Sequence, residues 1–278
     1  MMRSPTILLP LLLALALPVT ALAQQSPAAA PVPNPAAPLY RQTGEQYRVY
    51  EFPGTSEPIP YRLFVPESWT PGQRLPILIT LRAGTSINNN HRDGNDLVRA
   101  ARAHGYILIS PLGYRGYQQP YYGSPYPVIR PDGPSVPGRG WSAEEDKRAE
   151  QDVLNVLSLV AAEYGADTAR VFIHGQNPSG SAALNFVANY PQTFKAAVIS
   201  SGPIVTDSYP FANLAGKVAL LILHGENDSN NAIAASQAMA KTFQAQGVET
   251  LFLPVPGGEH LNAFLLAAEQ IYAFLDAH

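Results

Sequence analysis

The sequence predicts an α/β fold with a mostly parallel central sheet, helices on both faces and an antiparallel start. From residue 75 onward, continuous apolar runs of strand length alternate with helical stretches, which is typical of strands buried on both faces. Residues 47–50 and 61–66 instead alternate apolar and polar side chains, as half-buried antiparallel strands do. A chain of 278 residues with 46% apolar content can bury one such domain.

Each element is predicted from its own local pattern. Residues 75–81 are apolar except for Thr80, and residues 106–109 are also an apolar run, whereas residues 143–164 carry an apolar helical stripe and an acidic first turn. After the antiparallel opening we expect a strand at 75–81, a helix at 95–104, a strand at 106–109, a helix at 143–164, a strand at 171–174, a helix at 179–189, strands at 196–200 and 218–223, a helix at 232–246, a strand at 250–254 and a last helix from residue 261.

The N-terminal residues are predicted to precede the folded domain, which spans residues 43–278. Residues 1–23 have the pattern of a signal peptide, with Arg3, an apolar core and a small-x-small cleavage site at 21–23. An uncleaved anchor is the alternative, but the apolar run is short and Pro10 and Pro18 interrupt it. Residues 24–42 are rich in Ala and Pro and predict a mobile linker. We therefore expect a periplasmic or secreted protein without a membrane span after cleavage.

Composition excludes several classes of function. A formal charge of −3 with 14% charged residues provides no basic field for nucleic acid and no polybasic patch for lipid. The absence of cysteine excludes thiolate catalysis, cysteine-zinc sites and iron–sulfur clusters. The six histidines show no metal-binding motif, so no metal and no cofactor are expected.

Ligands of parallel sheets bind where the strands end, so the residues directly after the strands are the site candidates. The stretches concerned are LPILITLRAG, ARVFIHGQNPSGSAALNFVANYP, LLILHGENDSNN and PVPGGEHLNAF. They resemble extracytoplasmic α/β-hydrolases of the polyhydroxybutyrate-depolymerase, feruloyl-esterase and prolyl-oligopeptidase-like group. The resemblance implies an α/β-hydrolase fold, with Asp228 as the orienting acid and His260 as the base. It places the oxyanion region at residues Arg82, Ala83, Gly84 and Pro178.

The position of the family's serine nucleophile is occupied by asparagine. Counted from Arg170 before it and Pro191 after it, the nucleophile position is Asn177. The small residues that the turn needs are present around it, at Gly175, Ser179 and Gly180. The alternative nucleophile is Ser179 in a shifted turn, which requires an insertion in the strand and a compensating deletion in the helix.

Two features of this turn remove acyl-transfer chemistry. An amide is not made nucleophilic by an adjacent imidazole, and Pro178 has no N–H for the oxyanion. Pro178 also impedes conversion of Asn177 to aspartate, because the usual cyclisation needs the next backbone N–H. Arg82 stands where the family usually has histidine; it is either a solvated loop residue or a contact that favours an anionic ligand.

Three functions remain open. The first, which we favour, is a catalytically impaired homologue, a pseudoenzyme, that binds a small-molecule or polymer ester-like ligand. The second is a serine ester hydrolase that uses Ser179, and the third is a lyase or other general-base enzyme that uses Asp228 and His260. Aromatic side chains in residues 114–141 suit an aromatic ligand, although they could instead pack that long loop onto the domain. These candidate ligand-binding residues are Tyr114, Tyr117, Tyr121, Tyr122 and Trp141.

Overall fold

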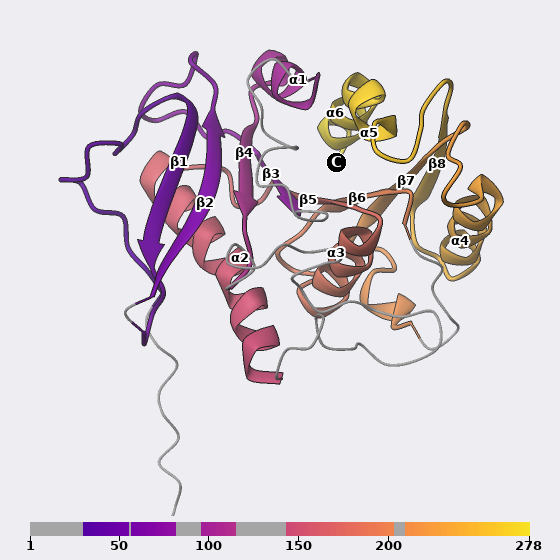
Figure 1. The fold of residues 1–278 in the computed structure, drawn as a ribbon, viewed down its shortest axis with the longest axis horizontal. Helices are drawn as coiled ribbons and strands as arrows, with labels where there is room; N and C mark the ends of the chain where they lie inside the picture. The colour runs from indigo at the N-terminus through magenta and orange to yellow at the C-terminus, as the bar shows by residue number, and fades with distance from the viewer. Residues whose placement is uncertain (1–29, 56, 82–95, 115–142, 203–208) are drawn as a thin grey trace, which may run out of the picture.

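The computed structural model describes residues 30–55, 57–81, 96–114, 143–202 and 209–278 of the chain (Figure 1). At its centre lies an eight-stranded sheet with the order β1-β2-β4-β3-β5-β6-β7-β8. In chain order the strands are β1 (Gly44–Glu51), β2 (Pro58–Val65), β3 (Ile77–Leu81), β4 (Ile107–Pro111), β5 (Val171–Gln176), β6 (Ala196–Ser200), β7 (Ala219–Gly225) and β8 (Thr250–Val255).

The sheet has the predicted mixture of strand directions. β2 pairs antiparallel with β1 and with β4, whereas all the neighbours from β4 to β8 run parallel. Gln176 at the end of β5 lies opposite Ser200 of β6, and Gly225 at the end of β7 lies opposite Val255 of β8. The carboxyl ends of β5 to β8 therefore form one edge of the sheet, which is where ligands of such sheets bind.

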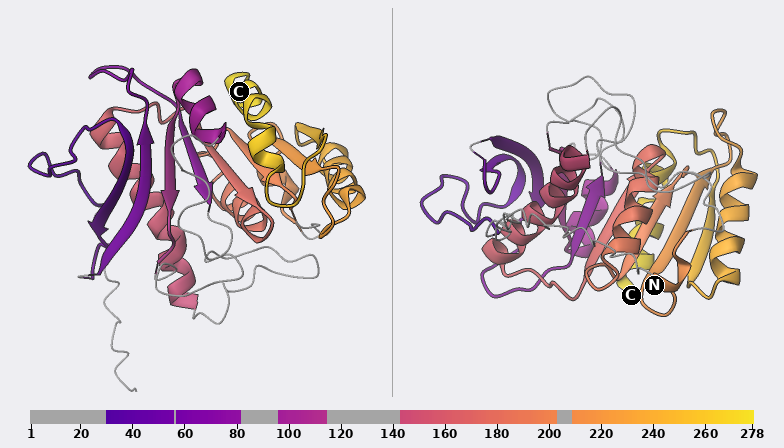
Figure 2. Two further views of the ribbon diagram at one scale, coloured as in Figure 1. Left: turned by 45° about the horizontal axis from the view of Figure 1, so that its top comes forward. Right: turned by 90° about the horizontal axis from the view of Figure 1, so that it is seen from below.

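Helices cover both faces of the sheet, as predicted. One apolar cluster joins the sheet to α2, α3 and α4, and a second joins the opposite face to α1, α5 and α6 (Figure 1). Ile77 and Ile79 belong to the first cluster and Leu78 to the second, because successive strand side chains point to opposite faces. The right-hand view of Figure 2 looks onto the face covered by α2 and α3. The helices are α1 (Asp96–His104), α2 (Ala143–Tyr164), α3 (Pro178–Asn189), α4 (Ile233–Ala245), α5 (Ala263–Leu266) and α6 (Ala268–Asp276).

The observed bounds differ from the prediction mainly at three places, and the first is β1, which begins at Gly44 rather than at residue 47. β2 begins at Pro58, before the predicted residue 61, and it includes Pro60. β4 pairs only with Tyr61–Phe64 of β2, so the first residues of β2 have a strand on one side only, where the missing N–H of proline is tolerated. The single helix predicted from residue 261 is instead the short α5 followed by α6.

Part of the predicted linker lies against the domain. The Arg41 N–H donates to Glu163 Oε1 at 2.6 Å, and the Tyr164 hydroxyl donates to the Gln42 carbonyl at 2.7 Å. Arg48 of β1 forms an ion pair with Glu163 at 2.7 Å. The end of α2 therefore holds residues 41–42 beside β1. Residues 1–29 lie outside the described ranges, and within those ranges no helix has the length and hydropathy of a membrane span.

Candidate active site

The turn between β5 and α3 is a single residue long. Asn177 has φ 51° and ψ −118°, a positive-φ conformation that residues other than glycine rarely adopt. Its N–H donates to the Ser200 carbonyl at 2.9 Å, and its carbonyl accepts the Gly180 N–H at 3.0 Å. Pro178 is the first residue of α3, where proline needs no hydrogen-bond partner for its nitrogen. The turn thus projects Asn177 at the carboxyl edge of the sheet.

Close packing of the turn explains the small residues that surround Asn177. A Cβ on Gly175 would lie 1.9 Å from the Ser179 carbonyl oxygen, so no side chain fits there. A Cβ on Gly180 would lie 3.2 Å from the Ile199 side chain, which is a tighter but less severe contact. The spacing of glycine around Asn177 is therefore a requirement of helix-on-strand packing.

His260 reaches Asn177 from the loop after β8. The loop after β7 packs directly on this loop: the Asn227 N–H donates to the Gly258 carbonyl at 2.8 Å, and a Cβ on Gly225 would lie 2.3 Å from the same oxygen. The Gln176 side-chain amide donates to the His260 carbonyl. These contacts position an imidazole that is only 8% exposed.

Asp228 is held as a carboxylate by several hydrogen bonds. The Asn230 and Asn231 N–H groups donate to Oδ1 at 2.8 and 2.9 Å, and His260 Nδ1 lies 2.9 Å from Oδ2. Burial alone would raise the pKa of Asp228, but the hydrogen bonds from Asn231, His260 and Asn230 outweigh burial and lower the pKa from 3.8 to about 2. Asp228 is therefore ionised at neutral pH.

The ionised carboxylate determines the direction of the hydrogen bonds in the site. Asp228 can only accept, so His260 Nδ1 carries the proton and the neutral ring presents its lone pair at Nε2. Asn177 Nδ2 lies 3.0 Å from Nε2 and donates to it. The chain of donors runs from Asn177 through His260 to Asp228, in the order of a serine-histidine-aspartate triad, with an amide in place of the hydroxyl.

A second histidine, His224, also contacts the acid, and the sequence analysis assigned it no role in the site. Its Nε2 lies 3.1 Å from Asp228 Oδ2 and 3.1 Å from the Asn231 carbonyl, while its Nδ1 lies 2.7 Å from the Ser236 hydroxyl of α4. The ring is fully buried. Asp228 Oδ2 therefore lies between two imidazoles, and the four-residue spacing of His224 and Asp228 was the available signal.

The other candidate residues fall into two groups. Ser179 lies within the first turn of α3 and is fully buried. Tyr114 is also fully buried, with its ring centre 5.0 Å from that of Phe52, so it packs in the core as the alternative interpretation of that loop proposed. The remaining candidates lie outside the described residues: Arg82, Ala83, Gly84, Tyr117, Tyr121, Tyr122 and Trp141.

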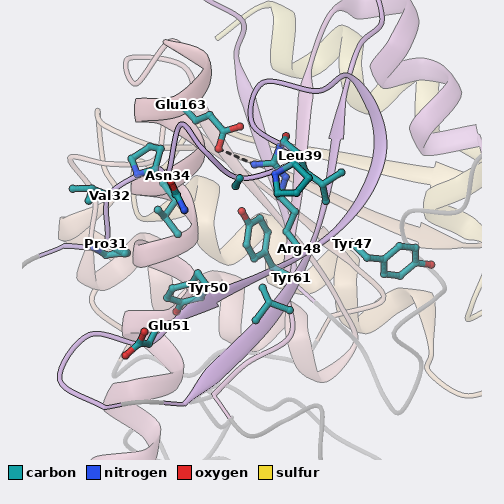
Figure 3. A pocket seen from close by; sticks show the side chains of 15 residues that line it. Pro31, Val32, Asn34, Leu39, Tyr47, Arg48, Tyr50, Glu51, Tyr61 and Glu163 are labelled. Atoms are coloured by element: carbon teal, nitrogen blue, oxygen red, sulfur yellow. Dashed lines mark hydrogen bonds and ion pairs between the residues drawn. The ribbon is translucent and has the colours of Figure 1, made fainter.

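A cavity of about 570 Å³ lies elsewhere, at the β1 edge of the sheet. Figure 3 shows it between residues 31–39 and the side chains of Tyr50 and Tyr61, with the Arg48–Glu163 ion pair in its wall. β1 is at the opposite end of the strand order from β7 and β8. This cavity therefore takes no part in the arrangement around Asn177.

The sheet, the sharp turn after β5 and the acid and histidine after β7 and β8 define an α/β-hydrolase. Solved structures agree on the fold. A thermostable esterase aligns with a TM-score of 0.57 and 18% identity over 84% of this chain and 62% of its own. An S-formylglutathione hydrolase from Agrobacterium tumefaciens aligns with a TM-score of 0.61 and 14% identity over 84% of this chain and 94% of its own.

The family follows from sequence comparison. The profile of the esterase family, described as "Putative esterase", matches residues 53–249, which is more than half of the chain, and the chain belongs to this family. Acetylxylan esterase A of Talaromyces purpureogenus is 25% identical over 140 residues, which are 50% of this chain and 32% of that protein. The match thus spans about a third of the length of this curated relative.

Proposed function

We propose that this esterase-family protein is a catalytically impaired homologue that binds an ester-like ligand without hydrolysing it. The observation that carries the proposal is Asn177 at the sharp turn, with its amide 3.0 Å from His260 Nε2. An amide nitrogen has no available lone pair for attack on a carbonyl, so the histidine has no nucleophile to activate.

Pro178 supports the same proposal independently. Hydrolases of this fold stabilise the developing oxyanion with the backbone N–H of the residue after the nucleophile. Pro178 occupies that position and has no N–H. Loss of one such donor costs about 10²- to 10³-fold in rate, so the site lacks two separate parts of the acyl-transfer machinery.

The serine-hydrolase alternative requires Ser179 to be the nucleophile. Against it stand the left-handed backbone of Asn177 and the contact of Asn177 with His260, together with the burial of Ser179 inside α3. A nucleophile must be exposed to its substrate, and it needs the histidine within hydrogen-bond reach. We therefore propose the Asn177 register for this chain.

The ligand that we propose is an acylated polysaccharide outside the cytoplasm. The name of the relative from Talaromyces purpureogenus supports an acetylated xylan, and the signal-peptide pattern of residues 1–23 supports export. A protein that binds such a polymer without turnover should be retained on acetylated xylan and should release no acetate from it. Deacetylated xylan is the matched control.

Labelling with a fluorophosphonate tests the proposal at the residue level. The purified wild-type protein should take up no label. In the xylan assay, failure of the protein to be retained on acetylated xylan, or release of acetate, would contradict ligand binding without turnover. Label mapped to Ser179 would establish the shifted register and overturn the assignment of Asn177. Retention without label or acetate is the expected result.

A second candidate function is favoured by the contact between His260 and Asp228. Their 2.9 Å hydrogen bond and the ionised state of Asp228 suit His260 as a general base in a reaction that needs no serine, such as the elimination of a lyase. In that case His260→Ala should abolish turnover of the substrate and change ligand affinity by less than about tenfold. Equal turnover in the wild type and in His260→Ala would exclude this function.

A further inference from the structure

The side-chain amide of Asn177 lies beside the imidazole of His260. Asn177 is half-buried, and the backbone bonds to Ser200 and Gly180 hold the residue in one position. The amide nitrogen lies 3.0 Å from His260 Nε2. An amide is hydrolysed only when its nitrogen is protonated as it leaves, and His260 is the group within reach to supply that proton.

Beyond the ligand-binding function, we propose that Asn177 is a self-modification site, where one water molecule converts the side-chain amide to aspartate with His260 as the acid and base. Water adds to Cγ of Asn177 and its proton passes to Nε2. The imidazolium then donates to Nδ2, the carbon–nitrogen bond breaks and ammonia leaves, taking the proton of the new acid. One amide and one water thus give one carboxylate and one ammonium ion, with no change of oxidation state.

Asp228 assists His260 both when it accepts the proton of the water and when it donates a proton to Nδ2. Its carboxylate accepts the Nδ1 proton of His260 at 2.9 Å, which leaves Nε2 free of a proton at the start and stabilises the imidazolium that forms. Its pKa of about 2 keeps it ionised throughout. In an esterase the Asp228–His260 pair would activate the water that attacks the substrate. In this proposal the same pair activates the water that attacks Asn177.

Pro178 removes the usual competing route. Asparagine normally loses its amide by cyclisation onto the nitrogen of the next residue, and the Pro178 nitrogen carries no hydrogen. The other internal route, attack of Nδ2 on the Asn177 carbonyl with chain cleavage, would have to break the bonds of Nδ2 to His260 and of that carbonyl to Gly180. Hydrolysis by water is the route that leaves the backbone contacts in place.

The test follows the side chain by mass spectrometry. The purified protein is incubated at neutral pH in water labelled with heavy oxygen and then digested with trypsin, which releases residues 171–195 as one peptide. We expect Asn177 to become normal aspartate that carries one heavy oxygen, with no isoaspartate. Asn185 in the same peptide, which donates to Glu150 at 2.9 Å, serves as the internal control and should remain an amide.

Variants connect the reaction to the histidine. General acid–base catalysis contributes about 10²- to 10⁴-fold, so His260→Ala should slow the conversion by at least about tenfold. His260→Gln keeps a polar side chain without proton transfer and should be equally slow, which separates chemistry from loss of folding. His278→Ala removes a histidine at the end of the chain, paired with Glu249, and should convert like the wild type.

Three outcomes would overturn the proposal. The first is an unchanged amide at Asn177 after prolonged incubation, and the second is conversion at the same rate in His260→Ala and the wild type. The third is cleavage of the chain between Asn177 and Pro178, which would assign the chemistry to the Asn177 carbonyl. None of these outcomes depends on the ligand, so they leave the proposed binding function to its own test.

Discussion

At the scale of single residues, Asn177 and Pro178 fit the backbone of the turn but lack the chemical groups that ester hydrolysis needs. Asn177 adopts the positive φ of 51° at this turn, and proline is well suited to the first position of α3. Both residues thus preserve the turn of an esterase. The same two residues lack the nucleophile and the N–H donor that the esterase reaction needs, so we propose that this chain keeps the fold and has lost hydrolysis.

Repair of the turn should therefore require two substitutions. Asn177→Ser restores a hydroxyl beside His260, but Pro178 still cannot donate to the oxyanion, so we expect little hydrolysis of a nitrophenyl acetate. Adding Pro178→Met supplies the N–H and should raise the rate by about two orders of magnitude, chiefly in kcat because the contact forms in the transition state. Steady-state kinetics of the two variants measure the difference.

The triple variant that adds His260→Ala is the control for this repair, and it should lose the activity that was gained. If Asn177→Ser alone hydrolyses the ester as fast as the variant with both substitutions, the residue after Asn177 does not contribute to the oxyanion site. The placement of Pro178 at that site would then be wrong.

At the scale of secondary structure elements, one buried carboxylate links β1, α2 and the segment after β4. Asp152 of α2 is fully buried, accepts the Tyr50 hydroxyl at 2.6 Å through Oδ1 and accepts the Gly113 N–H at 3.1 Å through Oδ2. Burial raises the pKa of Asp152 from 3.8 to about 7, because the cost of burying the charge outweighs the two hydrogen bonds. We therefore expect the packing of α2 on the antiparallel part of the sheet to depend on pH.

Asp152→Asn should reduce this dependence. The folded protein binds the Asp152 proton more tightly than the unfolded chain does, so this contribution is full below about pH 4 and is lost as the pH rises to about 7. The shift of about three pKa units corresponds to about 4 kcal/mol. Urea denaturation at pH 4 and pH 7 measures the free energy of unfolding of both proteins. Between pH 4 and pH 7 this free energy should fall further in the wild type than in Asp152→Asn, by up to about 4 kcal/mol.

Glu51→Gln is a suitable comparison because Glu51 lies at the exposed end of β1. It should keep the pH dependence of the wild type. If Asp152→Asn and the wild type lose stability in parallel between the two pH values, the proton of Asp152 does not govern the packing of α2.

At the scale of the whole molecule, the parallel sheet gathers residues that are far apart in the chain. Asn177 and His260 are separated by 83 positions and Asp228 and His260 by 32, yet the ends of β5, β7 and β8 bring their side chains within hydrogen-bond distance. The cavity beside β1 lies at the opposite end of the strand order and has an ion pair in its wall. The cavity lined by residues 31–39 and β1 is therefore separate from the candidate site at the ends of β5, β7 and β8.

Much of this architecture was predictable because it depends on local patterns. Strands buried on both faces are mostly apolar, and an amphipathic helix has an apolar stripe. Both patterns are visible in the sequence, at residues 77–81 and 143–164 respectively. The bounds of β2 were not predictable, because its prolines are tolerated only where β4 leaves one side unpaired. That condition concerns a neighbouring strand and has no local signal.

The fold class, the order of the elements and the placement of Asn177 and Pro178 at the turn could be read from the amino-acid pattern, since these depend on neighbouring residues and on spacing. Three features required the folded molecule: Tyr114 is buried, His224 shares Asp228 with His260, and the Asn177 amide donates to His260 Nε2. Contacts of this kind join separate strands, and their distances follow from how the sheet and its loops pack. A pattern along the chain contains no such distance.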